Sequence, residues 1–166
     1  MASSQCCDNP PVLNPTGGEG KVVDSFGGLK AYLAGSDESK AAVILISDVF
    51  GFESPNLRKI ADNIALSGYF VVVPDFLHGD PYTPENAEKP LPEWIKSHAP
   101  KKGFEEAKPV IAALKEKGMS SVGAVITIFW LYCFFSGEIK FFEILLAEHC
   151  PLAFPVGESD CAFSTI

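Results

Sequence analysis

The sequence lacks the cysteine and histidine spacings that metal-binding domains use. Its five cysteines are scattered, no two of them form a Cys-x-x-Cys pair, and no Cys/His cluster has zinc-finger spacing. An odd number of scattered cysteines is also atypical of a disulfide framework. We therefore expect a reduced protein without a metal site.

The sequence also lacks an excess of basic residues. The formal net charge is −8, and the lysines between Lys101 and Lys117 are interleaved with Glu105, Glu106 and Glu116. Because binding to phosphate backbones needs clustered lysine and arginine, we expect no nucleic-acid partner. The 47% hydrophobic and 20% charged fractions are typical of a globular protein, and 166 residues suit one domain.

Nothing in residues 1–20 has the form of a secretory signal, because no positive charge is followed there by an apolar run. This stretch is rich in proline, glycine, asparagine and serine, which predicts a loose lead-in. A cytoplasmic location is the expectation that follows.

Hydrophobic periodicity predicts strands alternating with helices. Residues 21–34 read as a hairpin turning at Gly27-Gly28, and residues 41–46 read as a strand buried on both faces. A helix is predicted after Pro55, ending at Gly68. Its apolar face is expected to contain Leu57, Ile60, Ala61, Ile64 and Ala65.

The alternation of predicted strands and helices continues after Gly68. Residues 69–73 form another buried-strand run, and residues 79–102 are proline-rich and irregular apart from one turn of helix at Glu93–His98. A helical stripe runs from Phe104 to Leu114 and ends at Gly118, with a kink or a late start expected at Pro109. A third strand is expected to open at Ser120 and to run to Ala124.

Buried strands that alternate with helices predict an α/β fold, with a mostly parallel sheet flanked by helices. Chemistry in such sheets lies at the carboxyl ends of the strands. Asp48 and Asp75 each follow a predicted strand and should share that edge. In the long irregular segment, His78 and His98 are candidates to line a substrate cleft.

Several segments resemble the dienelactone hydrolase family, and in particular its plant members, some of which are described as endo-1,3;1,4-β-glucanases. The resemblance is carried by Leu45–Gly51 (LISDVFG), Tyr69–Phe76 (YFVVVPDF), Val122-Gly123 and the N-terminal Gln5–Pro11 (QCCDNPP). Their order and spacing agree from about residue 5 to about residue 124.

The resemblance implies a partial α/β-hydrolase fold and hydrolysis of a small-molecule ester or lactone by a cysteine nucleophile, without a cofactor. It places an acidic residue near the nucleophile, here Asp48. It also places an oxyanion-hole donor at the backbone N–H of Val49. Phe50 and His78 are candidates to contact substrate.

The sequence departs from this family where the nucleophile should stand. A Gly-x-Cys-x-Gly turn should follow Val122-Gly123, but the chain continues as an apolar run in which no glycine flanks Cys133. A pair of Cys133 with His149 is conceivable, and Gly157–Cys161 (GESDC) is only a near match to the turn. We therefore expect a chain truncated before its nucleophile and with negligible turnover.

The domain division follows from this break. Residues 21–124 are read as the N-terminal half of the hydrolase-like domain, and residues 125–166 as a divergent, atypical C-terminal segment. That segment begins inside an uncharged span, Gly118 to Gly137. One interpretation is translated non-coding sequence, since its residue types correspond to thymine-rich codons.

Three alternatives remain open. The apolar residues 119–137 would suit a membrane anchor. The chain would also suit a non-catalytic binding fragment of a longer enzyme. Asp48 and Asp75 together would suit a glucan hydrolase, which needs two carboxylates at a set separation.

Overall fold

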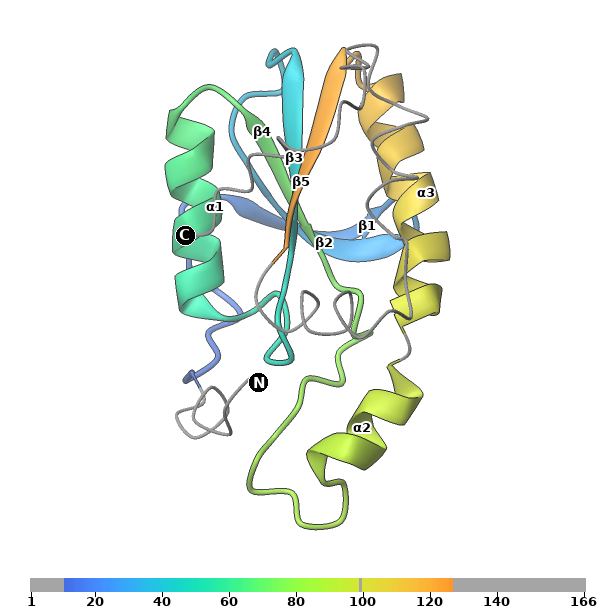
Figure 1. The fold of residues 1–166 in the computed structure, drawn as a ribbon. Helices are drawn as coiled ribbons and strands as arrows, with labels where there is room; N and C mark the ends of the chain where they lie inside the picture. The colour runs from blue at the N-terminus through green and yellow to red at the C-terminus, as the bar shows by residue number, and fades with distance from the viewer. Residues whose placement is uncertain (1–10, 99, 127–166) are drawn as a thin grey trace, which may run out of the picture.

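The computed structural model describes residues 11–98 and 100–126, in which strands and helices alternate (Figure 1). The elements in chain order are β1 (Lys21–Phe26), β2 (Leu29–Ala34), β3 (Ala41–Ile46), α1 (Pro55–Leu66), β4 (Phe70–Pro74), α2 (Leu91–Ser97), α3 (Pro100–Glu116) and β5 (Ser121–Ile126).

The strands of this region form one five-stranded sheet in the order β1-β2-β4-β3-β5. β3 pairs in parallel with both β4 and β5, whereas the β1–β2 hairpin joins the sheet through an antiparallel pairing of β2 with β4. Parallel neighbours need crossover connections, which α1 and α3 supply on opposite faces of the sheet (Figure 1). The predicted α/β fold class is confirmed.

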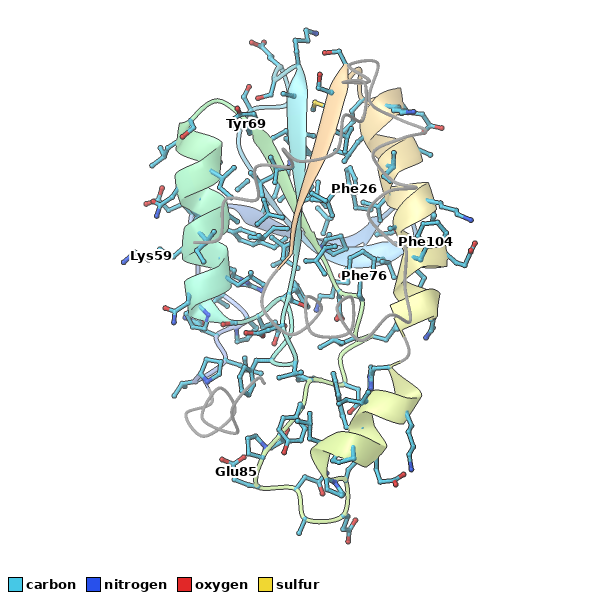
Figure 2. The ribbon with its side chains drawn as sticks, viewed as in Figure 1. Phe26, Lys59, Tyr69, Phe76, Glu85 and Phe104 are labelled. Atoms are coloured by element: carbon cyan, nitrogen blue, oxygen red, sulfur yellow. The ribbon has the colours of Figure 1, made fainter. Side chains whose placement is uncertain are left out.

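Each face of the sheet has its own apolar cluster. Alternate residues of β4 divide between them: Phe70 and Val72 pack toward α3, and Val71 and Val73 pack toward α1. Because both faces are covered, the strand reads as a continuous apolar run rather than an alternating one. Figure 2 shows Phe76, just after β4, on the α3 side of the sheet.

The buried face of α1 differs from the predicted stripe. Leu57 and Ala61 are buried as expected, but Ile60 is 40% exposed, so its assignment to the core face was wrong. Arg58, which the hydrophobic pattern could not identify as a core residue, is only 1% exposed. The helix is therefore rotated so that a charged side chain packs against the sheet.

Arg58 is tolerated there because backbone carbonyls satisfy its guanidinium. Its Nε donates to the Phe52 carbonyl at 3.1 Å, and Nη1 donates to those of Pro15 and Gly17 at 2.9 and 2.8 Å. Its guanidinium carbon also lies 4.9 Å from the centre of the Tyr32 ring. Burial lowers the Arg58 pKa. The hydrogen bonds to the Pro15 and Gly17 carbonyls connect residues 15–17 to α1.

Two helix boundaries and one strand boundary differ from the sequence prediction. α3 begins at Pro100 and continues through Pro109, so the late start expected at that proline was wrong. α2 is longer than the single turn expected at Glu93–His98. β4 begins at Phe70, which pairs with Ala42 of β3, and Tyr69 before it is 42% exposed.

The hairpin turn between β1 and β2 lies directly against α3. Gly27 has a positive φ of 59°, and a Cβ atom at this position would stand 2.5 Å from the Cα atom of Val110. Gly28 has a φ of 88°, but a Cβ atom there would meet no heavy atom within 4 Å. Both glycines therefore have a backbone conformation that other residues rarely adopt, but only Gly27 lacks the space for a side chain.

We expect Gly28→Ala to lower the free energy of unfolding by about 1–2 kcal/mol through left-handed strain alone. Gly27→Ala should lower it by roughly 3 kcal/mol or more, because the α3 backbone must also move. Urea unfolding of the two variants measures the difference. Equal losses would show that the turn does not pack against α3 as closely as the structure indicates.

Candidate active site

A tight turn follows β3 at the carboxyl edge of the sheet. The Asp48 carboxylate accepts a hydrogen bond from the Phe50 N–H at 2.9 Å, and the Gly51 N–H donates to the Asp48 carbonyl at 3.2 Å. Gly51 has a φ of 79°, which a glycine adopts without strain. An aspartate that caps its own turn and a glycine that closes it are therefore the local reasons for this geometry.

Asp48 is partly buried, and burial raises the pKa of its carboxyl, an effect that the Phe50 N–H partly offsets. Among the described residues, no lysine, arginine or histidine forms a salt bridge with it. A carboxyl with a perturbed pKa at the carboxyl edge of a parallel sheet is a functional-site candidate.

Val49 is fixed through its carbonyl and its buried side chain, whereas its N–H forms no hydrogen bond with the described residues. Its carbonyl accepts the Tyr82 N–H at 2.8 Å, and its side chain is 3% exposed. No acceptor for the Val49 N–H is found within residues 11–98 and 100–126. A fixed peptide with an unused donor is the arrangement that an oxyanion-binding group needs.

Phe50 lies inside an apolar cluster with Val49, Leu77 and Trp94, and it is 7% exposed. Its ring therefore packs beneath the turn and supports it. Contact between Phe50 and a substrate stays a prediction.

Asp75 follows β4 at the same edge, as the sequence predicted. It is 6% exposed, and its carboxylate accepts the Leu77 N–H at 3.2 Å. Burial raises its pKa as well. Because Asp48 and Asp75 both cap turns through backbone N–H groups, each has a structural role that does not depend on catalysis.

Residues 79–98 extend beyond the carboxyl ends of the strands and include α2 (Figure 1). Glu85 lies far out on this extension (Figure 2). Trp94 anchors the extension: it is 1% exposed, its indole Nε1 donates to the Asp80 carbonyl at 3.0 Å, and its ring meets Tyr82 edge-on at 6.0 Å. The irregular, proline-rich segment is thereby packed on the candidate site.

The structure brings His78 and His98 to one cavity of about 190 Å³. His78 Nε2 lies 2.9 Å from a Glu106 carboxylate oxygen, and His98 stacks on Trp94 with ring centres 4.0 Å apart. His78 has a φ of 54° and is the one non-glycine residue with a positive φ in the described part of the chain. Strained backbone of this kind clusters at functional sites.

Sequence reasoning missed Trp94 and Glu106, because their partners are distant in the chain. A tryptophan within a proline-rich loop was the available signal for the first. Nothing in the helical pattern of α3 distinguishes Glu106 from its exposed neighbour Glu105.

Some predicted residues lie outside the described ones, namely Cys133, His149 and Gly157–Cys161. Of the apolar residues 119–137, Ser121–Ile126 form β5, which pairs with β3 at one end of the described sheet. The helices of the described region include none with the length and hydropathy to cross a membrane. The described side chains also include no set of three metal-ligand types placed to hold an ion.

The raised pKa of Asp48 makes a prediction about stability. Its contribution is fully present below the usual carboxyl value of 3.8 and is lost as pH rises through the higher folded-state pKa. Asp48→Asn keeps an acceptor for the Phe50 N–H but cannot ionise. Urea unfolding from pH 3.5 to 7 should therefore show the variant gaining stability relative to wild type as pH rises.

The control for this comparison is Asp24→Asn, an exposed aspartate of β1. It removes a carboxyl by the same substitution at an exposed position. If the stability difference of Asp48→Asn followed pH in the same way as that of Asp24→Asn, the raised pKa of the Asp48 carboxyl would be contradicted.

Comparison with known proteins gives a consistent result. The family model described as "Dienelactone hydrolase family" matches residues 29–135. The chain is 52% identical over 124 residues to a Zea mays protein named endo-1,3;1,4-beta-D-glucanase, covering 72% of this chain and 40% of that protein. It is 35% identical over 104 residues to the human carboxymethylenebutenolidase homolog, covering 61% of this chain and 42% of that protein.

A third relative, hydrolase pyvD of Aspergillus violaceofuscus, is 28% identical over 130 residues, which cover 75% of this chain and 52% of that protein. A solved structure named m3DLH aligns with 65% of this chain and 47% of its own, with a TM-score of 0.48 and 18% identity. The chain thus spans about half or less of the length of these relatives.

Proposed function

The chain belongs to the dienelactone hydrolase family, and we propose that its described part forms the carbonyl-binding side of a site that hydrolyses a small-molecule ester or lactone. One observation carries this proposal: the Val49 N–H has no acceptor among the described residues, while the Tyr82 N–H fixes the Val49 carbonyl at 2.8 Å. Relatives named as hydrolases support the reaction class.

The chemistry follows from where charge develops. When a nucleophile adds to an ester carbonyl, the carbonyl oxygen becomes an oxyanion, and a fixed N–H stabilises that charge more than it stabilises the neutral oxygen. Val49 would supply this donor. Asp48, whose pKa burial raises, stands one residue before it and would orient or polarise groups at the same turn.

The described residues do not supply a matching nucleophile. The nearest arrangement is Ser97 Oγ, 3.1 Å from His98 Nδ1, with Asp80 3.6 Å from His98 Nε2. His98 Nδ1 also lies 2.9 Å from the Trp94 carbonyl, which can only accept, so Nδ1 carries the proton and cannot take one from Ser97. This group ends α2 and does not form a catalytic triad.

The name of the maize relative raises a glucan hydrolase as a second candidate. Such an enzyme needs two carboxylates free to act on a glycosidic bond. Asp48 and Asp75 each accept a backbone N–H of the turn that they begin. The ester or lactone reaction therefore has the better structural support.

Binding at Val49 can be tested without turnover. Titration with δ-valerolactone should move the amide proton of Val49 downfield and saturably in a ¹H–¹⁵N spectrum, because the lactone carbonyl accepts its hydrogen bond. Tetrahydropyran is the matched ligand without the carbonyl and should leave this resonance in place. An unmoved Val49 amide, or equal shifts with both ligands, would contradict the carbonyl site.

Turnover is a separate prediction. We expect the 166-residue chain to hydrolyse 4-nitrophenyl acetate no faster than a protein-free control, with Cys133→Ala unchanged from wild type. Saturable hydrolysis that disappears in Cys133→Ala would instead identify Cys133 as the nucleophile, and the expectation of negligible turnover would be wrong.

A further inference from the structure

The turn that contains Val49 is held at its far end by a side chain of α1. The Arg58 Nε donates to the Phe52 carbonyl at 3.1 Å, and the guanidinium carbon lies 5.4 Å from the centre of the Phe52 ring. Both side chains are buried, with 1% of Arg58 and 4% of Phe52 exposed. A charged donor forms a stronger hydrogen bond than a neutral one, so this contact fixes the carbonyl of Phe52.

The same guanidinium also holds the chain before β1, which passes the start of α1 (Figure 1). Its Nη1 donates to the carbonyls of Pro15 and Gly17 at 2.9 and 2.8 Å. A planar guanidinium points its N–H groups in fixed directions. Arg58 therefore sets the position of residues 13–17 relative to the turn after β3.

Residues 13–17 in turn contact that turn and its apolar cluster. The Asn14 N–H donates to the Glu53 carbonyl at 3.2 Å. The half-buried Leu13 side chain packs against the cluster that contains Val49 and Phe50. The surroundings of Val49 are thus built from residues 13–17 as well as from residues 79–98.

The direction of the Val49 N–H follows from these contacts. This N–H lies in one peptide plane with the Asp48 carbonyl. That carbonyl accepts the Gly51 N–H at 3.2 Å, and Gly51 directly precedes Phe52, whose carbonyl Arg58 holds. A donor stabilises an oxyanion efficiently only if its direction is fixed before the charge develops.

We propose that Arg58 is a positioning residue of the carbonyl site. It fixes the direction of the Val49 N–H through Phe52 and through residues 13–17, and it acts without contacting the substrate. The use of that N–H as an oxyanion donor rests on the proposed function, whereas the rigidity of its peptide does not.

The order parameter of the Val49 N–H bond, measured by ¹⁵N relaxation in the ligand-free chain, tests the positioning directly. In wild type we expect about 0.85, the value of rigid backbone. Leu13→Ala removes the packing of the N-terminal segment and should lower the value toward about 0.6. It should also weaken δ-valerolactone binding at the Val49 amide roughly threefold to tenfold, because a mobile group must be ordered when it binds.

The matched control is Val12→Ala. Val12 is the neighbouring residue, and it is 88% exposed. Its removal should leave both the order parameter of Val49 and the lactone affinity at their wild-type values.

Arg58→Lys tests the guanidinium itself, because lysine keeps the charge but lacks the planar fork. It should lower the Val49 order parameter and the lactone affinity at least as much as Leu13→Ala does. Tyr32→Phe is the control for lowered stability. It keeps the ring next to the Arg58 guanidinium but removes the hydroxyl that accepts the Gly20 N–H at 2.7 Å, and it should leave the Val49 order parameter unchanged.

An unchanged Val49 order parameter in Leu13→Ala and Arg58→Lys, or an equal fall in Val12→Ala or Tyr32→Phe, would overturn the positioning role. Wild-type lactone affinity despite a lowered order parameter would overturn it too. If Arg58→Lys does not fold, the Leu13 and Val12 variants decide. A Val49 amide that lactone never shifts would reject the proposed function, and the ligand-free order parameters would still decide whether its peptide is positioned.

Discussion

The position of every candidate functional group depends on the parallel pairing of β3 with its two neighbours. Ala42 stands opposite Phe70 of β4 and opposite Val122 of β5, so the three strands run in one direction and end at one edge. A shift of one residue would exchange the β3 side chains between the α1 face and the α3 face. Because these side chains differ in size, the close packing on each face opposes such a shift. The observed register places Asp48 and Asp75 at the same edge.

Residues 79–98, beyond that edge, pack against the turn that follows β3. Trp94 is buried in the extension, and Tyr82 carries the contact back to the Val49 carbonyl through its N–H. The same apolar cluster removes water from around Asp48, which is why the pKa of that carboxyl rises without a nearby charge of the same sign. Packing and electrostatics at this turn therefore have one common cause.

The sequence could predict elements that have a regular hydrophobic pattern and residues that directly follow a strand or a helix. The strands near residues 41–46 and 69–73, the glycine that ends α1, and the two aspartates at the strand ends all belong to this kind. Packing between distant segments was not predictable. Arg58 is buried because carbonyls 41 and 43 residues earlier accept its hydrogen bonds, and His78 meets a glutamate 28 residues later. No local pattern encodes such partners.

Leu77 lies between the candidate carbonyl site and the neighbouring cavity. It packs with Val49 in the turn cluster and also lines the cavity of His78 and His98. A substrate whose carbonyl oxygen is held at Val49 would therefore lie next to the cavity, with Leu77 between the two. An apolar side chain in this place would exclude water from a reacting bond at Val49. Selectivity for the group next to the ester would then come from residues that take no part in the bond-breaking step.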